Sequence, residues 1–450
     1  MSSMDMSKES VRESLRVQLW PVPLVAVILA LILGQTLPSL DRHLDDSMPP
    51  VVSGILFGGG PEAARSLLET IAGSTITVTS LTFSLTVVTL QLASSQFSPR
   101  LLRTFTRDRF VHNTLALFLA TFVFALTVLR SIRVETSAGP AFVPEIAVTT
   151  AFVLTIITVI GLVLFLAYLA RQIRVETMLR DVHRETDETL ERVFPEHHSR
   201  RPSVPSPDGR PDIVHASSSG FLTRVDTKAL LSAAARLEAF VTLDVAPGAS
   251  LVAGVPVARV WSAQAVPLDG DRLAGLADAV SRSLRTGFER TSTQDPSFGL
   301  QQLLDVTDKA LSPGVNDPTT AVHALSHISA ILCSLTARTT GPVTLYDTDD
   351  RARLNLTLPS FAELLDLVMD QLVTYAFTGP RTASRSIAML SEITISASRA
   401  GTLATHAPAL HGHRARARTA VETSTLDPVI RADLLSQLND IDQQPQQSRA

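Results

Sequence analysis

The first 170 residues alternate between long apolar runs and short polar loops, and the rest of the chain does not. Four of these runs contain no Asp, Glu, Lys or Arg: residues 20–40, 70–99, 111–129 and 146–170. A helix needs about 20 mainly apolar residues to cross a bilayer, so each run is long enough to span. The pattern predicts a four-helix transmembrane domain over residues 20–170, preceded by a polar N-terminus over residues 1–19.

The second run, residues 70–99, is unusual because Ser, Thr and Gln recur along it. A rotation of about 100° per residue places its polar side chains in two opposite stripes. The first, named here the threonine stripe, comprises Thr75, Thr79, Thr82, Thr86, Thr89 and Gln96. The second, named the serine stripe, comprises Thr77, Ser80, Ser84, Gln91 and Ser95. A helix that is polar on two faces has no wide face for lipid, so other helices or water should surround it.

Two interpretations of these stripes stay open. In the first, the hydroxyl groups pack against neighbouring helices and return hydrogen bonds to their own backbone. In the second, one stripe lines a hydrated path formed by several copies of the chain, and the other packs within the subunit. For the second interpretation, the threonine stripe supplies the candidate pore-lining residues.

A cluster of arginines follows the second run: Arg100, Arg103, Arg107 and Arg109. In a pore it would form a positive inner vestibule, which favours a small anion over a cation. The alternative is that the arginine cluster only reflects the general excess of Lys and Arg on the cytoplasmic side of membrane proteins.

The distribution of basic residues predicts the orientation. One side of the predicted membrane carries the arginine cluster together with Lys8, Arg12, Arg16, Arg171, Arg174 and Arg180. The other side carries only Arg42, Arg65, Arg130 and Arg133. We therefore expect a multi-pass protein with both termini in the cytoplasm, and with a cytoplasmic domain after the fourth span.

The second half predicts an α+β domain in five parts. We expect a connector helix over residues 171–195, a linker rich in Pro, Ser and Arg over residues 196–215, and a small β module over residues 216–263. Helices should follow over residues 264–440, and a disordered tail over residues 441–450. The segment VAPGASLVAGVPVARV resembles half of a lipoyl-type barrel, which implies a small β-barrel-like module. No lysine lies at a hairpin tip, so no attached biotin or lipoate is expected.

Composition and motifs narrow the function classes. A net charge of −4 gives no electrostatic reason to expect nucleic acid. The single cysteine, Cys333, excludes an intrachain disulfide. The chain contains no phosphate-cradling loop, dinucleotide fingerprint, nucleophile elbow or HExxH motif. We therefore predict no enzymatic activity, no catalytic residue and no cofactor.

One local motif in the second half, DKALSPGVNDPTTAV, carries candidate ligand groups. Asp305, Asp308, Asn316 and Asp317 would form a cation or effector site if they converged. The alternative is that Asn316 or Asp317 caps the next helix, with Pro318 at its first position.

A pair of histidines on that helix has the spacing of metal ligands. His323 and His327 are four residues apart, as paired zinc ligands often are. They have neither a third ligand nor the glutamate of HExxH, so no metal site is predicted.

Two blocks of the sequence carry a family resemblance. LLETIAGSTITVTSLTFSLTVVTLQLASSQFSPRLLRTFTRDR and RTSTQDPSFGLQQLLDVTDKALSPGVNDPTTAV resemble a bacterial family of predicted membrane proteins, the domain of unknown function 2254. The resemblance spans nearly the whole chain. It implies a bacterial inner-membrane protein with an N-terminal membrane half and a soluble C-terminal half, and it supplies no reaction, substrate or catalytic residue.

Two hypotheses for function follow. In the first, the chain forms a homo-oligomer in the lipid bilayer, a channel-like protein that passes a small ion and carries a cytoplasmic regulatory domain. In the second, it is a non-conducting membrane-anchored scaffold or sensor whose cytoplasmic domain binds a ligand or a protein.

Overall fold

The computed structural model describes residues 20–44, 56–96, 109–133, 141–172, 174–194, 204, 207–262 and 269–447. The chain divides into two compact units, Met1–Arg174 and Val175–Ala450. They are called here the N-terminal unit and the C-terminal unit, and each is described by itself.

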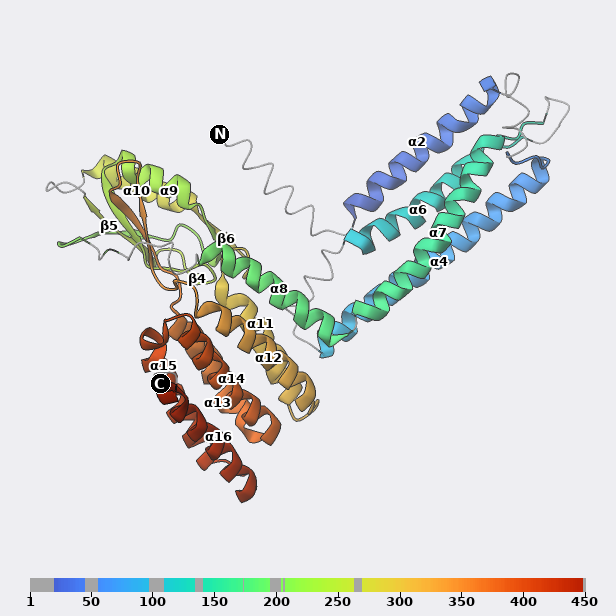
Figure 1. Ribbon diagram of the computed structural model, residues 1–450. Helices are drawn as coiled ribbons and strands as arrows, with labels where there is room; N and C mark the ends of the chain where they lie inside the picture. Colours follow the sequence, from blue (N-terminus) through green and yellow to red (C-terminus); the bar gives the residue numbers. More distant parts are fainter. Residues whose placement is uncertain are drawn as a thin grey trace. The chain divides into compact units, whose positions relative to one another are not determined.

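The N-terminal unit contains four long helices within the described residues, all long and apolar enough to cross a membrane. They are α2 (Pro21–Leu44), α4 (Pro61–Gln96), α6 (Arg109–Leu129) and α7 (Glu145–Gln172). This confirms the four predicted spans. Helix α6 contacts each of the other three helices and is the most buried of the four (Figure 1). The unit is therefore assembled around α6.

Small residues let these helices approach closely. Gly34 of α2 lies so near α6 that a Cβ atom added to it would be 2.7 Å from Cβ of Thr127. Ala125 of α6 and Ala147 of α7 are fully buried in the same apolar cluster. Such contacts are typical of membrane helices, where association depends on van der Waals packing.

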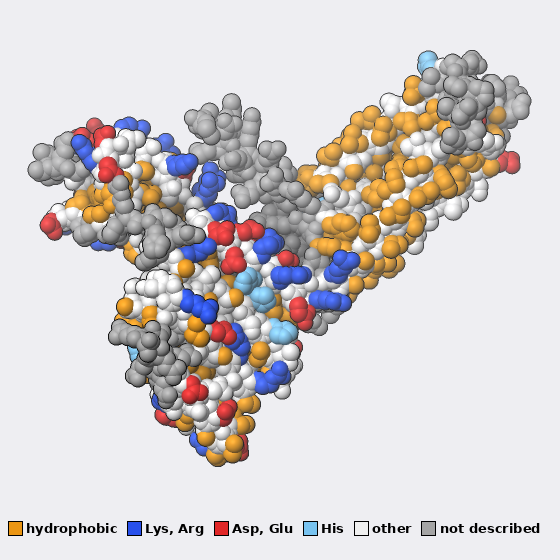
Figure 2. All heavy atoms as spheres, in the orientation of Figure 1, with side chains coloured by type: hydrophobic (Ala, Val, Ile, Leu, Met, Phe, Trp, Pro, Cys, Tyr) orange, Lys and Arg blue, Asp and Glu red, His pale blue; other side chains and the backbone are white. Residues whose placement is uncertain are grey.

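The outer faces of α2 and α7 are apolar. Leu29 on α2 and Val163 on α7 are more than half exposed. In Figure 2, hydrophobic side chains cover most of the visible face of these helices. This distribution is the one expected of helices in contact with acyl chains.

A buried carboxylate joins the ends of two helices in this unit. Asp41, in the last turn of α2, accepts hydrogen bonds from the backbone N–H groups of Ile146 (3.0 Å) and Ala147 (3.2 Å). These groups belong to the first turn of α7, which has no intrahelical acceptors for them. Asp41 therefore caps α7 from another helix, where a negative charge is also favoured by the helix dipole.

The C-terminal unit begins with α8 (Val175–Val193) and continues into a mixed region of strands and helices. Its elements are β1 (Asp212–His215), β2 (Gly220–Val225), α9 (Thr227–Arg236), β3 (Ala239–Leu243), β4 (Ser250–Leu251), β5 (Pro256–Ser262), α10 (Gly270–Ser283), β6 (Leu284–Gly287), β7 (Val343–Tyr346) and β8 (Ala352–Leu356). They form a five-stranded sheet in the order β1-β5-β3-β8-β7 and a three-stranded sheet in the order β4-β2-β6. Among the strands that the structure describes, β3 and β8 pair in parallel and the other pairs are antiparallel.

This arrangement confirms the sheet-containing C-terminal region but not its predicted barrel-like shape. The strands that the structure describes form two open sheets and no closed barrel. Two strands of the larger sheet, β7 and β8, come from between helices, well beyond residue 263. The strands before residue 263 therefore share their larger sheet with two strands from a later part of the chain. The local sequence pattern does not reveal this long-range pairing.

The remaining helices form a bundle against which α8 packs. They are α11 (Pro296–Leu311), α12 (Pro318–Leu335), α13 (Phe361–Tyr375), the short 3-10 helix η4 (Ala376–Thr378), α14 (Pro380–Arg399), α15 (Leu403–Glu422) and α16 (Pro428–Gln447). Side chains cap at least four of them: Asp295 on α11, Asp317 on α12, Ser360 on α13 and Asp427 on α16. Helix α8 contacts α11 and α12, as Figure 1 also shows.

The packing of α8 on α11 depends on a glycine. A Cβ atom added to Gly299 would overlap the side chain of Thr186 on α8. Thr186 is 3% exposed, and its hydroxyl donates to the carbonyl oxygen of Val182 (2.6 Å). Because Thr186 is held between its own helix and α11, it has no free space into which to move.

Replacing this glycine should therefore loosen α8. We expect Gly299→Ala to lower the free energy of unfolding of the C-terminal unit by about 1–3 kcal/mol, the usual cost of overpacking. Thermal unfolding of the full chain, followed by Trp fluorescence, measures the effect. Gly412→Ala on α15 is the matched control, since a Cβ there meets nothing within 4 Å. An equal loss in both variants would contradict the packing account.

Candidate functional site

The threonine stripe of α4 lies in the interior of the chain. Helix α4 packs against α6 and α7. The exposed fractions of the five described members are small: Thr75 3%, Thr79 7%, Thr82 1%, Thr86 9% and Thr89 7%. The side chain of Gln96 lies outside the described residues. In the single chain, these five members lie on a face that packs against other helices of the same chain, and the pore-lining role expected of the stripe stays a prediction.

Hydrogen bonds explain how these hydroxyls are accommodated. Thr79 donates to the carbonyl oxygen of Thr75 (2.7 Å), and Thr86 donates to that of Thr82 (2.8 Å). Thr89 donates in the same way to Leu85 (2.8 Å). Each bond runs from a hydroxyl to the carbonyl four residues earlier, the usual solution for Thr within an apolar helix. For these three residues the packing interpretation describes the observed contacts.

The serine stripe of α4 faces outward in the single chain. Its described side chains, Thr77, Ser80, Ser84 and Gln91, are all exposed, and that of Ser95 lies outside the described residues. Gly73 lies on the same face, and a Cβ atom added there meets nothing within 4 Å. On either side of the stripe, Leu81 and Phe83 are more than half exposed. A narrow polar stripe therefore lies between apolar flanks on the surface of the bundle.

The predicted vestibule falls outside the described part of the chain. Arg100, Arg103 and Arg107 belong to residues that the structure does not describe. Arg109 begins α6, and its side chain is also outside the description. The positive inner mouth stays a prediction.

The four candidate ligands in the C-terminal unit do not share a partner among the described residues. Asp317 caps α12, since its carboxylate accepts from the backbone N–H groups of Thr319 and Thr320 (3.1 Å each). The hydroxyl of Thr320 donates to the other oxygen (2.6 Å), and these bonds lower the pKa of Asp317. Asn316 adopts a left-handed backbone (φ 47°) and is exposed. For Asp317, the capping alternative describes its contacts.

Asp308 contacts another helix, and Asp305 contacts its own helix. The side-chain amide of Gln371 on α13 donates to one oxygen of Asp308 (2.7 Å). The other oxygen, Oδ1, is buried and has no hydrogen-bond partner within the described residues. Burial raises the pKa of Asp308 to about 6; the bond from Gln371 opposes the rise and the charge of Asp305 adds to it. Gln301 donates to Asp305 (3.0 Å), so this pair is separate from the α12 cap.

The structure brings together two histidines that local sequence does not pair. Nδ1 of His183 on α8 lies 3.1 Å from Nδ1 of His327 on α12. His183 also contacts Asp187 through Nε2 (3.1 Å), and this bond raises the pKa of His183. Burial lowers the pKa of His327, which favours a neutral ring that accepts the proton of His183. Local spacing within α12 pairs His327 with His323. The contact between His327 and His183 joins positions 144 residues apart, so only the fold reveals it.

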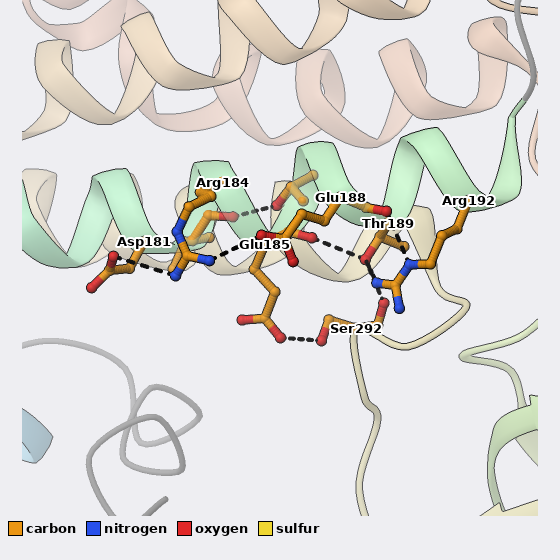
Figure 3. A network of polar contacts seen from close by, with 9 residues as sticks. Asp181, Arg184, Glu185, Glu188, Thr189, Arg192 and Ser292 are labelled. Carbon is orange, nitrogen blue, oxygen red and sulfur yellow. Dashed lines mark hydrogen bonds and ion pairs between the residues drawn. The ribbon is translucent and has the colours of Figure 1, made fainter. Parts of the chain in front are cut away.

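Helix α8 is further held by a polar network (Figure 3). The hydroxyl of Thr189 donates to the carbonyl oxygen of Ser292 (2.7 Å), and the hydroxyl of Ser292 donates to Glu185. Arg192 donates from Nε to the carbonyl oxygen of Glu188 and from Nη2 to the hydroxyl of Thr189, both at 3.0 Å. These bonds fix the guanidinium of Arg192 near the end of α8. No group of three or more metal-ligating side chains occurs among the residues described.

A cavity of about 760 Å³ opens beside this end of α8. Its walls come from α8, from β2 of the smaller sheet, and from β3, β7 and β8 of the larger sheet. Its volume is within the range of small-molecule sites, about 300–1,000 Å³. No sequence motif indicates it, since its lining is scattered over more than 160 residues.

The sequence has relatives over most of its length. Residues 16–392 match a family described as predicted membrane protein (DUF2254). The chain belongs to this family. The DUF2254 match includes α2, α4, α6 and α7, both sheets and most of α14, and it ends before α15.

Individual relatives agree with the family match. One uncharacterised protein from Mycobacterium bovis and one from Mycobacterium tuberculosis are each 33% identical to the chain over 402 residues, which is 87% of this chain and 74% of each relative. No solved structure shows a significant match. The DUF2254 family thus supplies a membrane location and no reaction.

The raised pKa of Asp308 predicts an unusual pH dependence. A carboxyl whose pKa is higher in the folded state binds more protons when folded, so it favours folding as the pH falls from about 6 towards 3.8. Asp308→Asn should remove this dependence and raise the free energy of unfolding at neutral pH, by about 1–2 kcal/mol after a discount for the partial exposure of this carboxyl to solvent.

Thermal unfolding of the full chain across this pH range measures the effect. Asp317→Asn is the control, because the pKa of Asp317 is lowered and that carboxylate favours folding at neutral pH. If Asp308→Asn were as pH-dependent as the wild type, the burial of this charge would not be the cause.

Proposed function

We propose that this DUF2254 protein is a bacterial inner-membrane protein that forms a homo-oligomer and acts as a channel-like protein. Both termini and the C-terminal unit would lie in the cytoplasm, as the distribution of Lys and Arg predicts. The observation that supports the proposal is the exposed serine stripe of α4, opposite a threonine stripe that is already buried.

The serine stripe suits contact with protein better than contact with lipid. Gly73, Thr77, Ser80 and Ser84 are small and follow each other at intervals of three or four residues on one exposed face. Small residues at this spacing let two membrane helices approach closely, and Ser or Thr hydroxyls then bond across the contact for about 1 kcal/mol each. We therefore assign the contact between copies to this stripe of α4.

The exposed serine stripe of α4 also supports the channel-like function. In a ring of several copies, the serine stripes would converge on the axis, so that the edge of each stripe contacts the neighbouring copy and its centre supplies hydroxyl and amide groups to a small ion. The arginine cluster after α4 would then make the cytoplasmic mouth positive, which favours anions. This assigns the pore-facing role to Ser80 and Ser84 in place of the buried threonines.

A second candidate function is a non-conducting, membrane-anchored sensor or scaffold. The cavity beside α8 favours it, because a ligand there would contact both sheets and the helix that follows the last span in sequence. In this alternative, copies still associate through α4, but no ion passes between them.

Disrupting the serine stripe should break the oligomer without unfolding the chain. We expect the double variant Ser80→Leu with Ser84→Leu to change the purified protein from an oligomer to a monomer, because bulky side chains would separate the helices. Both positions are exposed, so the fold of the single chain should be unaffected. Native mass spectrometry in detergent measures the mass.

The matched control for this variant is Val163→Phe, at a 62% exposed position on α7. It should leave the oligomer unchanged. A wild-type monomer, or an oligomer that survives the double variant, would overturn the proposed contact. Single-channel recording of the wild-type oligomer in planar bilayers then separates the two functions, since a channel conducts and a scaffold does not.

A further inference from the structure

The cavity beside α8 is lined by apolar side chains and by two arginines. The apolar side chains include Leu243 of β3, Val343 and Leu345 of β7 and Leu356 of β8. The two arginines of the lining are Arg192 of α8 and Arg224 of β2. An apolar lining with a few charged groups is typical of sites for small organic molecules.

Both arginines lack a carboxylate partner among the described residues. The guanidinium of Arg192 is positioned by two neutral oxygens, the carbonyl of Glu188 and the hydroxyl of Thr189 (3.0 Å each). Arg224 is exposed and takes part in no ion pair that the structure describes. Glu191 also lines the cavity, but its carboxylate lies 3.9 Å from the guanidinium of Arg338. The cavity therefore has an excess of positive charge.

The strand pairing adds a second observation. In the register of β2 and β6, Arg224 lies directly opposite Arg285. Like charges in this position repel and destabilise a strand pair, unless a counter-charge lies between or beside them. An anion in the cavity would relieve this repulsion and would also pair with Arg192, for which a guanidinium fork is well suited.

We propose that this cavity binds a small organic anion. Its phosphate, sulfonate or carboxylate group would pair with Arg192 and Arg224, and its apolar body would lie against Leu243, Leu345 and Leu356. This deepens the sensing alternative described above. The site does not depend on contact between copies, so its test and the test of the oligomer fail independently.

Ligand binding at this site would act on α8. Arg192 belongs to α8, and Thr189, which orients it, also bonds the segment before α11. A ligand would therefore tighten the end of α8, which lines the cavity and belongs to a helix that packs on α11 and α12.

The test uses the full chain in detergent and 4-fluorophenyl phosphate, a soluble aryl phosphate observed by ¹⁹F NMR. We expect saturable binding to the wild type. Arg192→Gln combined with Arg224→Gln should weaken it at least about tenfold, since two charge-assisted bonds are lost. Arg236→Gln, an exposed arginine of α9 that does not line the cavity, should bind like the wild type.

Two comparisons make the result decisive. Inorganic phosphate and 4-fluorobenzyl alcohol, which carry only the head group or only the ring, should each compete at least about tenfold more weakly than the aryl phosphate. If the double variant does not fold, as judged by its thermal midpoint, Arg224→Gln alone is used, because that side chain is exposed. No saturable binding, equal binding by the arginine variants, or equal competition by either fragment would overturn the proposal.

Discussion

The structure of the membrane half depends on one constraint: a hydroxyl group within hydrocarbon must find its hydrogen-bond partner inside the protein. Helix α4 carries hydroxyls on two opposite faces, and threonines on both faces donate to their own backbone, as Thr77 of the exposed face does to Gly73 (2.8 Å). Thr79, Thr86 and Thr89 point into the bundle and donate to their own backbone. The opposite face, with Ser80 and Ser84, is exposed in the single chain. The association of copies that we propose supplies the protein surface that this face lacks.

In the C-terminal unit, α8 connects the parts. It packs on α11 where Gly299 leaves room for Thr186, it contacts α12 through two histidines, and its end borders the cavity between the sheets. These contacts come from sequence positions far apart, and α8 directly follows the last span. A charge or ligand that changes any of these contacts acts on α8, the helix of the C-terminal unit that is nearest in sequence to the N-terminal unit. The proposed anion site would use this arrangement.

The sequence predicted the four spans because charged side chains are excluded from hydrocarbon, which makes their limits visible. It could not decide between the stripes of α4, since both are polar. One signal was available: Ala64, Leu68 and Ile71 continue the threonine stripe along the same face, and an apolar continuation marks the core side. The larger sheet, the His183–His327 contact and the cavity were beyond reach, because each joins segments that no local pattern relates.

In the proposed assembly, the serine stripe meets another copy and the threonine stripe does not. Cysteine crosslinking in native membranes tests it most directly, after Cys333→Ser removes the natural thiol. With Ser84→Cys, the account predicts a disulfide-linked dimer on mild oxidation. Thr82 is two residues from Ser84 but is buried inside the chain, so with Thr82→Cys we expect only monomer. Dimers from Thr82→Cys, or none from Ser84→Cys, would contradict the account.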